Sequence, residues 1–184
     1  MREIKIIFFA IGTFFGIENS TIFSETTTVN IDTKQRIISI TQENLFALSR
    51  SAEDSINIYN QLLEIGRPKD EVPSWRDEFK DYEFKTIELI SNKNNNQLNA
   101  KIQLKYNHQK QLEDYAIDYV SDSYEYALIN IDSWNISTEK GNLKENFWYF
   151  DSDISFTLSP TKTMPEAYKI HKISLYNYWE KIKQ

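Results

Sequence analysis

Glycine, cysteine and histidine are scarce in this chain, and their scarcity excludes several kinds of site. The 184 residues include four glycines, two histidines and no cysteine. Gly-rich phosphate loops and dinucleotide fingerprints need closely spaced glycines, because only glycine lets the backbone approach a phosphate so closely, and no such spacing occurs here. The lack of cysteine excludes disulfides, thiolate nucleophiles and Cys-based zinc sites. Two histidines cannot make a three-His zinc site, so we expect neither a cofactor nor a bound metal.

The charge balance is acidic, with 21 Lys and Arg against 27 Asp and Glu and a net charge of −6. Proteins bind nucleic acid largely through clusters of Lys and Arg that neutralise phosphates. No run of basic residues occurs in the sequence, and we therefore expect no nucleic-acid partner.

The first 24 residues have the pattern of an export signal. A short charged start is followed by an apolar stretch over residues 6–17. As a helix this stretch would span about 18 Å, short of a hydrocarbon core of about 30 Å. The best cleavage point follows Ser24. We therefore expect residues 1–24 to be a cleaved signal peptide and residues 25–184 to form a single domain that is periplasmic or secreted.

Two other interpretations of the N-terminal segment stay open. It could remain uncleaved as an anchor, the one case in which the sequence favours contact with a membrane, or it could be a buried core segment. Cleavage would remove two basic and two acidic residues, so the mature chain would keep the net charge of −6. The remaining chain of about 160 residues is long enough to bury a core without disulfides.

A long helix is predicted over residues 41–65, because apolar residues recur there with a period close to 3.6. Gly66, followed by Pro68, predicts where this helix ends. Residues 35–40 fit a short strand before the helix. The polar segment 25–33 predicts a loose leader without regular structure.

Further along the chain the pattern changes to strands. Residues 82–91 and 98–106 are separated by a polar, Asn-rich turn, and the second of them alternates strictly between apolar and polar side chains, which predicts a hairpin. Residues 124–136 and 146–159 are rich in β-branched and aromatic residues and predict strands. Residues 109–123 fit a helix better than a strand by the number of apolar residues on one face, although the strand interpretation stays open.

The order of these elements predicts an α+β fold. A C-terminal helix is expected from Pro165 to about Lys183. The long N-terminal helix and the further helices would pack on one antiparallel sheet of four to five strands. A cone-shaped sheet curled around the first helix is a variant of this arrangement. No motif is specific enough to name a family.

The only plausible catalytic residues are carboxylates. Asp151 and Asp153 flank a serine directly after an aromatic run, and on a strand both would point to one face, about 7 Å apart. Two carboxylates at such a spacing can act as acid and base on a glycosidic bond or bind a hard cation. Asp-Ser-Asp is also a typical turn composition, and acids on the outer face of a strand are usually solvated. A serine hydrolase would need a nucleophile elbow, which is absent.

Aromatic residues are the strongest indication of a binding surface. The chain has 11 Tyr, 11 Phe and 4 Trp. Tyr and Trp bind sugars by stacking and make protein interfaces, because they bury a large area at low entropic cost. Core packing and an A/T-rich codon bias explain the same residues without a function. The candidate binding residues are Trp134, Trp148, Tyr149, Tyr124 and Tyr126.

The sequence does not identify a substrate or partner. It favours a non-enzymatic, exported binding protein that acts outside the cytoplasm, through an aromatic and acidic surface, on an unknown protein or glycan. An inhibitor or immunity-type protein is one form of this hypothesis. Two alternatives stay open. One is a carboxylate-dependent enzyme acting on envelope glycans, and the other is an accessory subunit of an envelope assembly.

Overall fold

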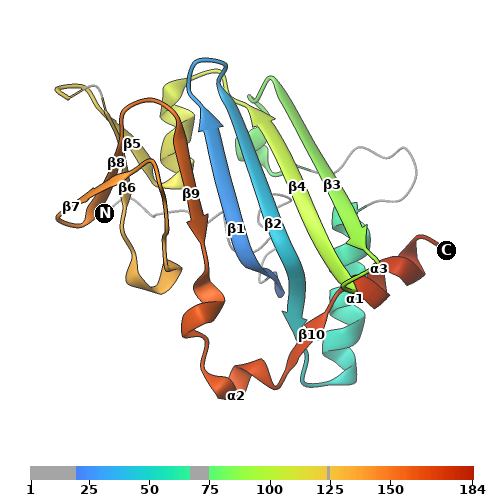
Figure 1. Ribbon diagram of the computed structural model, residues 1–184. Helices are drawn as coiled ribbons and strands as arrows, with labels where there is room; N and C mark the ends of the chain where they lie inside the picture. The colour runs from blue at the N-terminus through green and yellow to red at the C-terminus, as the bar shows by residue number, and fades with distance from the viewer. Residues whose placement is uncertain (1–19, 67–74, 124) are drawn as a thin grey trace.

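Two antiparallel sheets dominate the protein (Figure 1). The computed structural model describes residues 20–66, 75–123 and 125–184. The larger sheet has the strand order β3-β4-β2-β1-β9, with a short strand β10 paired to β2, and the smaller sheet has the order β5-β6-β8-β7. The strands are β1 (Ile22–Asp32), β2 (Ile37–Leu48), β3 (Phe84–Asn92), β4 (Gln97–Lys105), β5 (Ile117–Val120), β6 (Glu125–Ile129), β7 (Asn142–Lys144), β8 (Phe147–Phe150), β9 (Ile154–Leu158) and β10 (Lys172–Ser174).

The helices are mostly short, and this corrects the predicted fold class. The α-helices are α1 (Ala52–Gly66), α2 (Glu166–Lys169) and α3 (Tyr176–Ile182), and the 3₁₀ helices are η2 (Asp77–Phe79), η3 (Gln109–Tyr115), η4 (Asp132–Trp134) and η5 (Pro160–Thr163). The described chain is therefore mostly β, with two sheets. The prediction of an α+β fold, in which a long N-terminal helix packs on one sheet of four to five strands, is wrong.

The predicted helix over residues 41–65 is two elements, because β2 continues to Leu48 before α1 begins. Buried side chains alternate along β2 up to Gln42, and burial then resumes at Leu45. Between them Asn44 has a φ of 52°, in the left-handed region that few residues adopt. This residue shifts which side chains face the core, so the buried positions skip by three. A spacing of three is also what a helix gives, which is why the pattern resembled one.

The segment expected to be a loose leader is instead most of β1. Thr27, Val29 and Ile31 are buried on one face, while Asn30 between them is exposed. β-Branched residues suit a half-buried strand even when their hydroxyls make the sequence polar. Residues 1–19, which hold most of the predicted signal peptide, lie outside the described residues.

The hairpin predicted over residues 82–91 and 98–106 is confirmed as β3 and β4, which pair in an unbroken register.

Residues 109–123, for which helix and strand were both open, contain one element of each kind. They form η3 and then β5, separated by Ala116 with a φ of 57°. The stretches 124–136 and 146–159 are only partly strand: η4 follows β6, and β8 and β9 belong to different sheets.

The C-terminal helix predicted from Pro165 to about Lys183 is confirmed only at its two ends, as α2 and α3, because β10 interrupts it. Ile173 in β10 pairs with Ala47 near the end of β2. The pairing of β2 with β4 stops at Gln42, so the last part of β2 has a free edge on that side for β10 to fill. A strand edge with unpaired N–H and C=O groups favours the addition of another strand.

One face of the larger sheet carries the core, and helices cover it. Ile58, Leu62 and Ile65 of α1 are buried in this core together with Trp179 of α3. The opposite face is polar, with cross-strand bonds such as that between the hydroxyls of Thr28 and Thr157 (3.1 Å). An antiparallel sheet with one packed and one solvated face alternates in this way.

The connection from β9 to β10, residues 159–171, forms an arch at one end of the larger sheet. β9 pairs with β1 and β10 pairs with β2, so the arch passes the end of the sheet where β1 begins. Figure 1 shows it at the lower end of the sheet, opposite the turn that joins β1 to β2. It contains η5 and α2.

Candidate functional site

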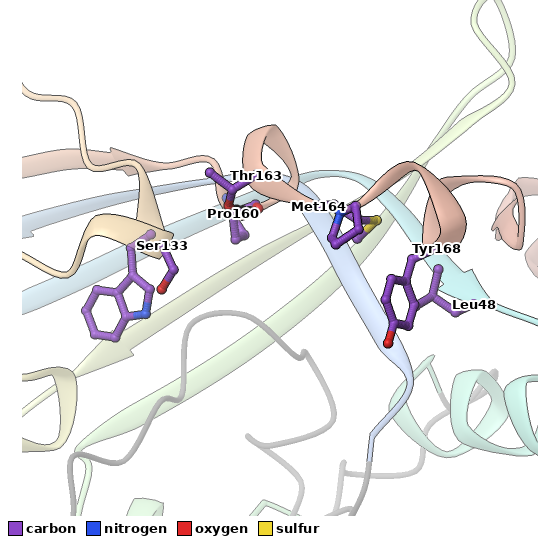
Figure 2. Close-up of a pocket in the computed structure, with 8 residues that line it drawn as sticks. Leu48, Ser133, Pro160, Thr163, Met164 and Tyr168 are labelled. Atoms are coloured by element: carbon purple, nitrogen blue, oxygen red, sulfur yellow. Dashed lines mark hydrogen bonds between the residues drawn. The ribbon is translucent and has the colours of Figure 1, made fainter.

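An open groove of about 400 Å³ lies between the arch, η4 and the end of β2, and we call it the arch groove. Its lining residues are Leu48, Ser133, Trp134, Pro160, Thr163, Met164, Pro165 and Tyr168. Figure 2 shows Ser133 at one end, Leu48 and Tyr168 at the other, and the labelled arch residues between them. This volume is at the lower end of those usual for ligand sites.

Trp134 lies at one end of the groove because two backbone hydrogen bonds fix η4. The N–H of Trp134 donates to the carbonyl of Ile131 (2.9 Å), and its own carbonyl accepts the N–H of Ser159 at the start of the arch (2.9 Å). Asn135 follows with a φ of 46° and ends the turn. The side chain of Trp134 is only 4% exposed, so it contributes a rigid wall and also belongs to the core.

The arch itself is held by short local bonds. The backbone N–H of Met164 donates to the carbonyl of Thr161 (3.1 Å), and the hydroxyl of Thr163 donates to the carbonyl of Pro160 (3.2 Å). Proline fixes φ near −65°, so Pro160 and Pro165 limit the conformations that the arch can adopt. The groove is therefore built on a preformed loop.

Glu25 in β1 ties the arch and β10 to the sheet. The hydroxyl of Thr161 donates to the Glu25 carbonyl (3.3 Å). The Glu25 carboxylate pairs with Lys172, whose ammonium lies 4.6 Å from the ring centroid of Phe46. Burial alone would raise the pKa of Glu25, but hydrogen bonds from Lys172 and Asn44 and the charge of Lys172 lower it below the usual 4.5.

Leu48 and Tyr168 meet at the other end of the groove. The backbone N–H of Ser49 donates to the carbonyl of His171 (2.9 Å), which extends the pairing of β2 and β10. The Arg50 guanidinium carbon lies 5.3 Å from the centroid of the Tyr168 ring. The ring is 44% exposed, so it presents apolar area to solvent at the mouth of the groove.

The groove has the chemistry of a binding site. Six of its eight lining residues are apolar or aromatic, and the polar groups among them are the hydroxyls of Ser133, Thr163 and Tyr168. The lining described here contains no carboxylate, histidine or lysine. A mainly apolar lining with a few hydroxyl groups can hold and orient a ligand.

The predicted carboxylate pair lies elsewhere. Asp151 and Asp153 are both exposed, in the connection that leads from β8 in the smaller sheet to β9 in the larger one. They do not share a strand, and neither lines the arch groove. Among the residues that the structure describes, no three His, Asp or Glu side chains gather as a metal site would require.

The predicted aromatic residues are not brought together in one site. Trp134 alone lines the arch groove. Trp148 and Tyr126 pack against the core, and the Trp148 indole N–H donates to the Asn130 side chain (3.1 Å). Tyr149 lies beside Phe147, with ring centroids 6.4 Å apart. The remaining candidate, at position 124, lies outside the described residues.

A second concave surface of about 450 Å³ lies next to β5, but it gives no clear chemical preference. Its lining mixes both signs of charge with one apolar and one aromatic residue: Gln109, Lys110, Glu113, Ile117, Asp118 and Tyr119. Tyr119 and Tyr126 form a ring pair with centroids 5.2 Å apart, which holds this rim of the smaller sheet together.

Three tyrosines near η2 and η3 are buried in the core. Burial raises the pKa of Tyr106 to about 12, and it raises the pKa of Tyr82 and Tyr115 further, with Tyr115 fully buried. These phenols therefore stay neutral at physiological pH, and all three belong to the core.

Comparisons with known proteins add no family to this picture: no protein-family model, curated protein or solved structure matches this chain. No helix within the described residues is both long and apolar enough to span a membrane.

The residues that line the arch groove, apart from Trp134, were not singled out as candidates by the sequence pattern. Pro160 and Pro165, which bracket the loop, were the available signal.

Proposed function

We propose that this chain is a non-enzymatic binding protein whose arch groove holds an extended segment of a partner protein. The observation that carries the proposal is the lining, which combines the Trp134 indole and the Tyr168 phenol with two prolines. Figure 2 shows Ser133 and Tyr168 at opposite ends, with Pro160 between them. Aromatic-lined grooves suit extended segments, because rigid aromatic rings offer a large apolar area in a fixed geometry.

Two properties of the site support a protein partner. The mouth of the groove is open, and the arch exposes two large apolar side chains near it, Tyr168 and Ile170, the second of which is 78% exposed. Exposed apolar surface of this kind is typical of protein interfaces. The predicted signal peptide supports action outside the cytoplasm. An inhibitor or immunity-type role is one form of the proposal, since such a protein acts by occupying a surface.

Site-specific photo-crosslinking tests this function. A photoreactive phenylalanine analogue at Thr163, which is exposed and lines the groove, should form a covalent product with the partner in cells that make the protein. Met164→Asp should abolish that product, because a carboxylate in an apolar groove costs binding energy.

Ile90→Asp is the matched control for this experiment. It makes the same change at an apolar residue that is 40% exposed on β3, at the other edge of the larger sheet, and it should leave the product intact. Crosslinking that survives Met164→Asp, or an equal product from an analogue placed at position 90, would show that the groove is not the binding site.

A further inference from the structure

Arg50 places a positive charge at the Tyr168 end of the arch groove. Its guanidinium stacks on the Tyr168 ring at 5.3 Å from the centroid, and its side chain is exposed. Leu48, two residues earlier in the chain, and Tyr168 both line the groove. A ligand that fills the groove with an apolar group therefore has a guanidinium next to its Tyr168 end.

Among the residues that the structure describes, no hydrogen bond from the Arg50 side chain occurs, so its donors are available in this position. A guanidinium is planar and carries five N–H donors around its edge. Within the part of the chain that the structure describes, Arg50 makes no ion pair. The pKa of Asp54 is lowered mainly by a hydrogen bond from the Arg50 backbone, and the charge of the Arg50 side chain adds a smaller contribution. The Asp54 Oδ2 atom accepts the backbone N–H groups of Arg50 (2.7 Å) and Ser51 (2.9 Å).

A second cation lies on the arch itself. Lys162 is exposed in η5 and has no ion pair among the described residues, whereas Lys169 in α2 is paired with Glu166 at 2.6 Å. The groove thus has two unpaired cations beside it, although the chain as a whole has a net charge of −6. At the Trp134 end the exposed neighbour of Ser133 is Asp132. Lys162 lies between Pro160 and Thr163 in η5, which contacts η4. Arg50 is therefore the cation at the Tyr168 end, and it suits a segment whose acid lies at that end.

We propose that the partner segment carries a carboxylate side chain beside the apolar side chain that fills the groove, and that Arg50 binds this carboxylate through its N–H edge. The inference rests on the proposed function and specifies the partner's chemistry. Arginine and carboxylate can form two parallel charge-assisted hydrogen bonds. Because the pair lies at the mouth of the groove, where water screens it, it contributes selectivity more than affinity.

Selection from a phage-displayed library of random linear peptides tests the inference. The wild-type protein should enrich peptides in which Asp or Glu neighbours an aromatic or aliphatic residue. Arg50→Glu should weaken these peptides about tenfold, because one exposed attraction is replaced by a repulsion of similar size. Arg50→Lys should weaken them less, since it keeps the charge and loses the bidentate geometry.

Lys34→Glu is the matched charge reversal. Lys34 is exposed in the turn before β2, at the far end of that 12-residue strand from Leu48. The distance along the strand is therefore about 35 Å or more. This variant should bind the selected peptides as the wild type does.

Two failures of this experiment are distinguishable. If the selected peptides fail to bind the Met164→Asp variant but bind the Arg50→Glu variant as tightly as the wild type, the carboxylate inference is overturned and the groove remains the binding site. If the peptides still bind the Met164→Asp variant, or if the selection enriches no peptide, the result counts against the proposed function, and the inference fails with it.

Discussion

Removal of the first residues of β1 should strongly destabilise the protein. A cleavage after Ser24, the point that the sequence favours, would leave a chain beginning at Glu25. In the structure Ile22, Phe23 and Ser24 pair in register with the end of β2, and Ile22 is fully buried. The chain beginning at Glu25 therefore lacks three of the ten residue pairs that join β1 to β2.

The magnitude follows from three contacts. Burying an isoleucine side chain contributes about 1.5–3 kcal/mol. The Phe23 and Phe46 rings, with centroids 5.9 Å apart, add about 0.5–1.5 kcal/mol. The hydrogen bond between the hydroxyls of Ser24 and Thr27 (2.7 Å) adds about 1 kcal/mol. The expected loss is about 3–5 kcal/mol, a large part of the 5–15 kcal/mol typical of a domain.

Urea denaturation followed by circular dichroism measures this loss. With a slope of about 2 kcal/mol per molar urea, the midpoint of the chain beginning at Glu25 should fall by about 2 M relative to one beginning at Ser20. A chain beginning at Ile22 is the control. It loses mainly the hydrogen bonds of Ser20 and Thr21 to the Gln61 side chain. Its urea midpoint should therefore stay close to that of the chain beginning at Ser20.

Equal midpoints for the chains beginning at Ser20 and Glu25 would refute this reasoning. The expected result has a consequence for export. If the signal peptide is cleaved, the mature N-terminus of the stable protein lies at or before Ile22, and N-terminal sequencing of the protein from cells would locate it.

Two further predictions concern packing and pH. Gly66→Ala should destabilise the protein by about 1–2 kcal/mol in a urea titration, because a Cβ would lie 2.3 Å from Cζ3 of Trp179 and such overpacking outweighs alanine's helix propensity. Trp179→Phe should make the added cost of Gly66→Ala smaller, and a stabilising Gly66→Ala would contradict the close contact. The second prediction follows from the lowered pKa of Glu25. The stability that its pair with Lys172 contributes is present above pH 4.5 and is lost as the pH falls through the folded-state pKa. Lys172→Met should therefore cost up to about 1 kcal/mol more at pH 6 than at pH 3, and an equal cost at both pH values would count against the pairing.

The elements that the sequence predicted correctly are those whose periodicity is unbroken. The hairpin of β3 and β4 keeps one register over its whole length, so the alternation of buried and exposed residues along β4 is visible in the amino-acid order. The end of α1 at Gly66 was predicted as well, although the close approach of Trp179 gives this glycine a second reason. Local signals succeed where the structure depends only on neighbouring residues.

The fold class could not be predicted, because an irregularity at Asn44 in β2, shared by the facing part of β1, changes which side chains face the core. Asn44 adopts a left-handed conformation, and its partner strand shows the same shift, with burial passing from Ser24 to Thr27. The amino-acid type at position 44 does not by itself predict this left-handed conformation, because asparagine can adopt it but usually does not. The backbone N–H of Asn44 instead donates to the side chain of Asn99 in β4 (2.8 Å), a contact between residues 55 positions apart.

The same local shift accounts for the arch groove. At Asn44 the backbone bonds to a side chain of β4, and regular pairing between β2 and β4 has already stopped at Gln42. The last part of β2 is thereby free to pair with β10, while β9 is held on the other side of β1. The arch must then pass the start of β1, and in doing so it brings Tyr168 to Leu48 and Pro160 close to Trp134. The irregular backbone at Asn44, which gave the sequence of β2 a helical spacing, is therefore also needed to form the arch groove. The groove depends on pairing between distant strands, so sequence motifs alone could not have predicted it.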